Sequence, residues 1–127
     1  MVLFQDEDPK TNALQAVRTA LAIRGKAREI CDECSSLYRP LEINMGINSG
    51  MALVGAAKFD SYTGSRWTYT ARGQLTNIAA RVGAQATKGG IYMTKNTADR
   101  IKDQYDLKPV GELSLKNVSE AVEVFSL

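Results

Sequence analysis

The sequence predicts an α+β fold with a sheet rich in antiparallel strands. Apolar residues recur with the 3.6-residue period of a helix over residues 9–37. Short apolar runs elsewhere alternate as strands do and are separated by turn residues, such as Asn48-Ser-Gly50. The resulting order is strand, helix, two strands, helix, strand, helix and two strands. Consecutive strands in this order pair as hairpins, which excludes a doubly wound parallel sheet.

In the first half of the chain we expect a strand, one long helix and a hairpin. Residues 1–4 are apolar and predict the strand. Asp8 is a suitable N-cap and precedes a proline, which favours the first turn of a helix over 9–37. The alternating segment 41–46 and the apolar segment 51–54 are expected to pair as a hairpin across the turn between them.

The second half alternates between helix and strand. Helices are expected at 73–86 and 94–105, and strands at 91–93, 110–115 and 121–125. The last two strands are expected to pair with each other across a polar turn.

A long polar stretch at 56–72 interrupts this pattern and is expected to be a loop. It contains Phe59, Tyr62, Trp67 and Tyr69. Loops of this length in a small domain are usually functional, and aromatic residues are enriched at interfaces. An ordinary surface loop and an arm that reaches a partner both remain open.

The composition excludes several classes of function. Histidine is absent, which removes the commonest general base and the Ser-His and Cys-His nucleophile pairs. The net charge is only +2, with basic residues dispersed along the chain, so we expect no nucleic-acid partner. No apolar run is long enough to cross a bilayer and no signal peptide is evident, so we expect a cytoplasmic protein without direct membrane contact.

The only two cysteines, Cys31 and Cys34, are three residues apart. Two cysteines without histidine cannot complete a four-ligand zinc site. A redox role is conceivable for this spacing, but the cysteines lie within the predicted helix with no strand before them. Buried thiols in a reducing cytoplasm are the simpler interpretation.

Asn77 and Arg81 are the strongest candidates for a binding site. They are four residues apart, so they share one face near the start of the predicted helix. A helix N-terminus favours anions, and an arginine binds phosphate oxygens with its two-pronged guanidinium. A solvated helix face with no ligand is the alternative interpretation. Gly73, just before them, would allow close approach of the backbone.

Several separated motifs resemble the class III nucleotidyl cyclases, in order and over essentially the whole chain. They are Met45-Gly-Ile-Asn-Ser-Gly50, Val54-Gly55, Tyr69-Thr-Ala-Arg-Gly73, Thr76-Asn-Ile-Ala-Ala-Arg81 and Leu115-Lys-Asn-Val-Ser-Glu-Ala-Val-Glu-Val-Phe125. The resemblance implies a ferredoxin-like cyclase fold that is truncated on its N-terminal side. Residues 1–127 would be a single, partial catalytic domain, its C-terminal part.

In that family the ribose 3′-oxygen attacks the α-phosphate, and pyrophosphate leaves as a cyclic mononucleotide forms. By resemblance, Asn77 orients the ribose and Arg81 stabilises charge on the reacting phosphate. Thr70 contacts the purine edge, with Ala71 and Gly73 also in the nucleotide site. A threonine at this position goes with ATP in the family, so ATP is favoured over GTP as the substrate.

The family's catalytic Mg²⁺ or Mn²⁺ ions are held by two aspartates that would lie before Met1. Neither aspartate is present, and Asp6 and Asp8 do not match their positions; the family's purine-contacting lysine is also missing. Three further departures look tolerable: they are Gln74, Asn117 and Ala121. We therefore expect metal ions only in the parent protein and no metal ligands in this chain, whose cyclase activity alone should be absent.

Three functions remain in view. The first is part of an enzyme that makes cyclic AMP, and the second is a silent cyclase-homology domain for dimerisation or nucleotide sensing. A generic RNA-binding α+β module is the third, and the weak charge argues against it. The family's active sites form between two subunits, so we expect a homodimer or other oligomer through residues 56–72.

Overall fold

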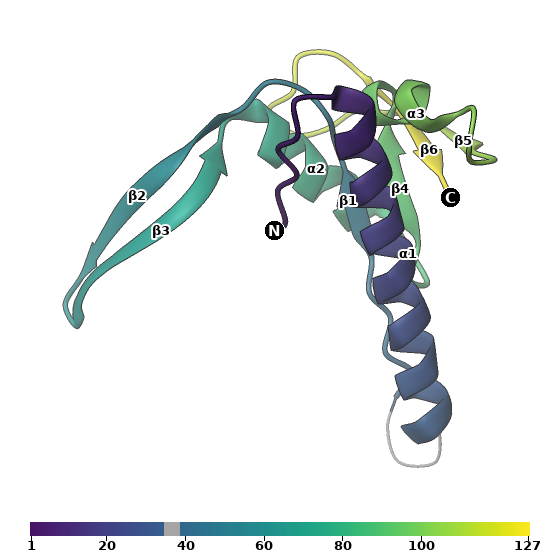
Figure 1. Cartoon of the computed structure of the whole chain (residues 1–127), viewed down its shortest axis with the longest axis horizontal. Helices are drawn as coiled ribbons and strands as arrows, with labels where there is room; N and C mark the ends of the chain where they lie inside the picture. Colours follow the sequence, from purple (N-terminus) through teal and green to yellow (C-terminus); the bar gives the residue numbers. More distant parts are fainter. Residues whose placement is uncertain (35–38) are drawn as a thin grey trace.

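Helices cover both faces of a four-stranded sheet, and a two-stranded hairpin extends from this layered body (Figure 1). The computed structural model describes residues 1–34 and 39–127. In chain order the elements are α1 (Pro9–Cys34), β1 (Met45–Ile47), β2 (Leu53–Ser61), β3 (Gly64–Arg72), α2 (Gln74–Gln85), β4 (Ile91–Thr94), α3 (Lys95–Ile101), β5 (Lys108–Leu113) and β6 (Val122–Ser126). The predicted α+β class is confirmed.

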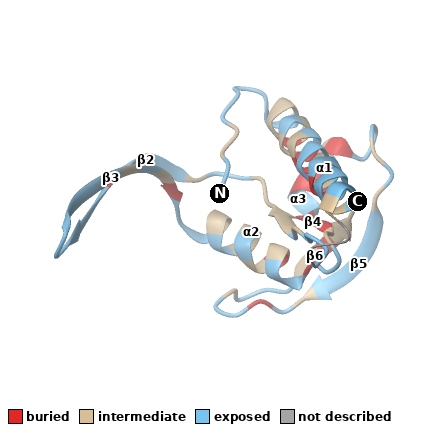
Figure 2. Ribbon diagram, turned by 90° about the horizontal axis from the view of Figure 1, so that it is seen from below, coloured by how far each residue is buried: buried red, intermediate tan, exposed pale blue. Residues whose placement is uncertain are grey.

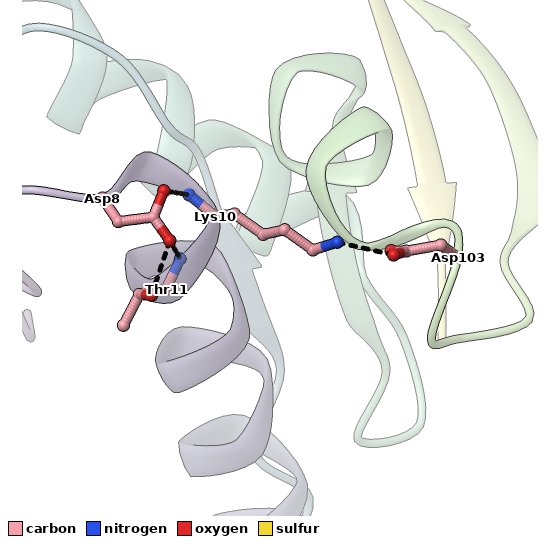
Figure 3. A network of polar contacts seen from close by, with 4 residues as sticks. All are labelled: Asp8, Lys10, Thr11 and Asp103. Atoms are coloured by element: carbon pink, nitrogen blue, oxygen red, sulfur yellow. Dashed lines mark hydrogen bonds and ion pairs between the residues drawn. The ribbon is translucent and has the colours of Figure 1, made fainter.

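Helix α1 begins at Pro9 as predicted, with Asp8 as its cap. The Asp8 carboxylate accepts hydrogen bonds from the backbone N–H groups of Lys10 and Thr11, at 3.3 and 3.2 Å. The Thr11 hydroxyl also donates to it and is the largest cause of the lowered pKa of Asp8. From the same turn, the Lys10 ammonium reaches Asp103, 2.5 Å away in the turn after α3 (Figure 3).

The sheet has the strand order β1-β4-β6-β5. Strand β1 is parallel to β4, with Met45 opposite Ile91, whereas β4, β6 and β5 pair antiparallel. The predicted pairing of the last two strands is confirmed, with an irregularity between Pro109 and Gly111. Among the described residues β1 pairs with β4 alone, so its other edge is unpaired.

Two apolar clusters hold the layers together. Successive strand residues point to opposite faces, and Ile91 and Met93 pack with Val17 of α1 and Ile101 of α3 on one face. On the other face, Val82 of α2 packs with Val124 of β6 and with Leu115, in the segment between β5 and β6. The buried residues of α1, Ala13, Val17, Ala20 and Ala27, follow the predicted helix period, whereas Ile30, which continues the same period, is exposed.

The stretch at 56–72 is not the expected loop but most of a hairpin of two nine-residue strands, which begins at Leu53. Strands β2 and β3 pair from Leu53–Arg72 to Ser61–Gly64, with a two-residue turn at Tyr62 and Thr63. The hairpin projects away from the body (Figure 1) and is almost entirely exposed (Figure 2). Because neither face is buried along most of its length, it lacks the apolar alternation that identifies a strand in sequence.

Three further expectations about strands are wrong. Residues 1–4 form no strand, because no strand of the described chain pairs with them. The segment 41–46 was expected to be a strand, but the strand observed there, β1, spans only Met45–Ile47. It pairs with β4 rather than with residues 51–54. Strand β2 begins at Leu53 and pairs with β3 instead.

The helix boundaries need smaller corrections. Helix α3 ends at Ile101 rather than at 105, and hydrogen-bonded turns follow it. The end of the first predicted helix, 35–37, lies outside the described residues. Helix α2 matches its predicted span of 73–86 to within one residue at each end, with Gly73 and Ala86 as its caps.

Candidate functional site

The candidate site is built on a strand, a glycine and a helix that follow one another directly. Thr70 and Ala71 lie at the end of β3, opposite Gly55 and Val54 of β2. Ala71 is buried, whereas Thr70 is partly exposed. Within the described part of the chain, the Thr70 hydroxyl makes one long hydrogen bond of 3.4 Å, to the Ala71 carbonyl. The Thr70 hydroxyl therefore retains most of its capacity to bind another group.

Gly73 makes the turn from the strand into α2. Its φ of 119° and ψ of −170° belong to a region that is essentially restricted to glycine. Its carbonyl accepts from the Asn77 N–H at 3.4 Å and from the Thr76 hydroxyl at 3.0 Å. No side chain caps the helix, and its first turn has no acidic residue. This end of α2 thus keeps the partial positive charge of a helix N-terminus.

Asn77 and Arg81 lie together on the outer face of α2. At about 100° per residue, they lie roughly 160° to either side of Ala79, which faces the body of the protein. Asn77 is exposed and Arg81 is partly buried. Among the described residues Arg81 forms no ion pair. The two side chains can therefore donate hydrogen bonds to a ligand that approaches this face.

A groove on this side of the protein is separate from the face that carries Asn77 and Arg81. This groove, of about 780 Å³, runs between α1 and α2 along the unpaired edge of β1. Residues 1–4, β1 and one side of each helix line it, including Ala20 of α1 and Gly83 of α2. Neither Asn77 nor Arg81 lines the groove, so it is not the predicted site.

Asn48 contacts the start of α2, whereas the sequence predicted it only as a turn residue. The Asn48 side chain donates to the Leu75 carbonyl in the first turn of α2, at 3.1 Å. The two residues are 27 positions apart, and a local turn signal does not reveal a partner at that separation. Only the position of Asn48 within the motif that begins at Met45 drew attention to this segment.

The residues present do not by themselves fit a Mg²⁺ or Mn²⁺ site. Within 1–34 and 39–127, no three side chains of the histidine, cysteine, aspartate or glutamate type are grouped closely enough to hold a metal ion. Cys31 and Cys34 are both free thiols, and both are partly exposed rather than buried as expected. The Cys31 sulfur contacts the chain that returns from α1, accepting from the Leu41 N–H at 2.8 Å.

The fold and this strand–glycine–helix segment define a nucleotide cyclase domain. The family model described as the adenylate and guanylate cyclase catalytic domain matches residues 1–127, and the chain belongs to this family. The resemblance found in the sequence is thereby confirmed. In the part of the chain that the structure describes, no helix is both long and apolar enough to span a bilayer.

Known relatives share this assignment. The chain is 32% identical over 95 residues to the receptor-type adenylate cyclase GRESAG 4.2 of Trypanosoma brucei brucei. This match covers 72% of the present chain and 16% of the trypanosome protein. The adenylyl cyclase CyaB of P. aeruginosa superposes with a TM-score of 0.84 at 29% identity, over 96% of this chain and 61% of that one.

The guanylyl cyclase Cya2 gives a TM-score of 0.76 over 98% of this chain and 61% of that structure. At 24% identity, this match establishes the shared fold alone. The chain therefore spans about three fifths of each solved structure and about a sixth of the trypanosome protein.

Proposed function

We propose that residues 1–127 form the C-terminal part of a class III cyclase catalytic domain whose complete form converts ATP to cyclic AMP and pyrophosphate. The observation that supports this most directly is the outer face of α2, where Asn77 and Arg81 are available to a ligand beside an uncapped helix start. This arrangement suits a nucleoside triphosphate, which combines a sugar with several negative charges.

Each residue has a distinct part in the proposed reaction. The Asn77 amide orients the ribose, so that the 3′-oxygen faces the α-phosphorus. The Arg81 guanidinium donates to the phosphate oxygens on which charge develops as the bond to pyrophosphate breaks, and it stays protonated throughout. Thr70 meets the purine edge, while Ala71 and Gly73 let the backbone run close to the nucleotide.

ATP is the proposed substrate, with GTP as the less favoured one. A threonine hydroxyl both donates and accepts hydrogen bonds, so Thr70 alone does not decide between the two purines. The two relatives of highest identity reported above are named as adenylate or adenylyl cyclases, at 32% and 29% identity. This naming, together with the family's use of threonine here, favours ATP.

The proposed active form is a dimer in a cytoplasmic compartment, with Mg²⁺ or Mn²⁺ bound through residues outside this chain. The β2–β3 hairpin is the proposed dimer contact, because it carries Phe59, Tyr62, Trp67 and Tyr69 in exposed positions. Since the described residues do not fit a metal site, we propose that this chain alone has no cyclase activity. Turnover by the isolated 127-residue chain would contradict that part of the proposal.

The test is to measure cyclic AMP and cyclic GMP produced by the complete catalytic domain with ATP or GTP. Formation of cyclic AMP from ATP supports the proposal. A second candidate is a silent cyclase-homology domain used for dimerisation or nucleotide sensing, and the lack of a carboxylate cluster among the described residues favours it. Nucleotide binding or dimerisation without either product would identify this second function.

A further inference from the structure

A small polar cluster lies where β1, β4, α2 and α3 meet. Asn48 and Ser49 follow β1, Thr94 ends β4, and Thr97 lies in α3. Thr94 and Thr97 are the buried polar residues of the described chain, 4% and 0% exposed. The Thr94 hydroxyl donates to Asn48 Oδ1 at 2.7 Å, and the hydroxyls of Ser49 and Thr97 are 2.9 Å apart.

Asn48 links this cluster to α2 through both ends of its amide. Its oxygen accepts from Thr94 and from the Ser49 N–H, at 2.7 and 3.0 Å. Its nitrogen donates to the Leu75 carbonyl at 3.1 Å. Since Oδ1 has two donors and Nδ2 faces a carbonyl, the orientation of the amide is fixed by its partners. Asn48 therefore connects the first turn of α2, at Leu75, to Thr94 at the end of β4.

Helix α2 meets β1 closely at a second place, in its last turn, at Gly83. A Cβ atom on Gly83 would lie only 2.9 Å from the Gly46 nitrogen. Together with the packing of Val82 against Val124, these two contacts, which are separated along the helix axis, fix both the tilt and the rotation of α2. Asn77 and Arg81 both lie between Leu75 and Gly83 along α2, so their positions depend on both contacts.

We propose that Asn48 is a positioning residue, which holds α2 so that Asn77 and Arg81 meet the nucleotide in reactive geometry. This inference rests on the proposed function and assigns to it a residue that does not touch the nucleotide. Loss of the contact to Leu75 releases the start of α2 while the Gly46–Gly83 contact keeps the helix on the sheet. A displacement of about 1 Å at reacting groups costs on the order of 10²-fold in rate.

Three variants separate positioning from general stability. Asn48→Ala removes all of the amide's bonds. Asn48→Asp keeps the oxygen that accepts from Thr94 and Ser49 but removes the donor to Leu75, so it tests that contact where the alanine variant fails to fold. Ser49→Ala is the matched control, because it breaks the bond to Thr97 in the same cluster and leaves α2 untouched.

The first measurement is amide hydrogen exchange in the 127-residue chain, read over residues 75–81. We expect exchange there to speed up about tenfold or more in both Asn48 variants and to change little in Ser49→Ala. Equal acceleration in Ser49→Ala, or unchanged exchange in the Asn48 variants, overturns the inference. This readout needs no catalytic activity, so a wild-type domain that forms no cyclic nucleotide refutes the proposed function without deciding this question.

The second measurement is steady-state kinetics of the complete catalytic domain. We expect kcat to fall tenfold to a hundredfold in Asn48→Asp, with KM within about twofold of the wild-type value, because misplacement affects the transition state more than substrate binding. Ser49→Ala should retain wild-type kcat. A rise in KM at constant kcat overturns the positioning role, as does an equal loss of kcat in Ser49→Ala.

Discussion

The backbones of Gly46 in β1 and Gly83 in α2 lie in direct contact. A Cβ atom built on Gly46 would lie 2.7 Å from the Gly83 Cα, and one on Gly83 would lie 2.9 Å from the Gly46 nitrogen. Both obstacles are backbone atoms, which cannot rotate away as a side chain does. The spacing between the strand and the helix is therefore set by the absence of two side chains.

Gly46→Ala should destabilise the fold substantially. The added methyl group forces β1 and α2 apart, and overpacking of this kind costs about 1–3 kcal/mol or more. Urea unfolding followed by circular dichroism measures the loss. Gly25→Ala is the control, because Gly25 lies within α1 with nothing within 4 Å of its Cβ position.

The control should change stability in the opposite direction. Alanine is favoured over glycine inside a helix by about 0.5–1 kcal/mol, so Gly25→Ala should raise the free energy of unfolding. Equal stability of Gly46→Ala and the wild type would show that the strand and helix can move apart without cost.

Local signals were sufficient to predict α2 and its start. The period of Ile78, Val82 and Ala86 defines a buried face, and Gly73 marks the boundary. Both signals lie within about four helical turns of sequence, so the prediction of this helix does not depend on residues that are distant in the chain. Asn77 and Arg81 were located for the same reason, because the helix that carries them is determined locally.

Strand pairing was predicted less well, because it depends on distant partners. Met45 pairs with Ile91, 46 residues away, while the nearer segment 51–54 offered a plausible hairpin. The β2–β3 hairpin was missed because its exposed residues do not alternate in polarity. Its Trp67-Thr-Tyr-Thr70 run does contain aromatic and β-branched residues, which favour strands.

Gly73→Ala should destabilise the site through its backbone. Nothing lies within 4 Å of the Gly73 Cβ position, so the cost comes from φ of 119° rather than from a clash. A non-glycine residue held in such a region costs about 1–3 kcal/mol. Gly55→Ala is the matched control, since Gly55 has equally open space and no such φ. Equal melting temperatures for the two variants would contradict this explanation.

Replacing Lys10 with methionine should raise the pKa of Asp103. The hydrogen bond from the Lys10 ammonium is the largest cause of the lowered pKa of Asp103, with the charge attraction adding to it. Because the folded-state pKa is depressed, the pair stabilises the protein above pH 3.8, the ordinary aspartate value, and this contribution disappears as the pH falls through the folded pKa.

An NMR titration of the Asp103 carboxyl carbon measures the change. In Lys10→Met the midpoint should move up toward 3.8. The control is Lys26→Met, which removes a lysine that pairs with Glu29 within the same helix. A midpoint that stays in place in Lys10→Met would show that the pair does not persist in solution.

Truncating the aromatic face of the hairpin should weaken self-association. Trp67 and Tyr69 share one face of β3, opposite Lys58 and Ala56, and both are exposed. If the pair of aromatic side chains together contributes about 2 kcal/mol or more, the double alanine variant should raise the dissociation constant about 30-fold or more. Sedimentation velocity measures it, with Val110→Ala on β5 as the control. A wild-type chain that stays monomeric at high concentration would refute the dimer contact.

Arg81→Ala in the complete catalytic domain should lower kcat without unfolding the protein. Arg81 is partly exposed on the outer face of α2 and makes no ion pair within the described residues, so its loss leaves no buried charge unpaired. Removing one donor that stabilises charge in the transition state costs on the order of 10²–10³ in rate.

Gln85→Ala, four residues further along α2 and also exposed, should leave kcat unchanged. Cyclic AMP formation under saturating ATP gives the comparison, and circular dichroism confirms that each variant folds. Full activity in Arg81→Ala would remove this residue from the proposed mechanism, whereas equal losses in both variants would indicate damage to α2 rather than loss of a phosphate contact.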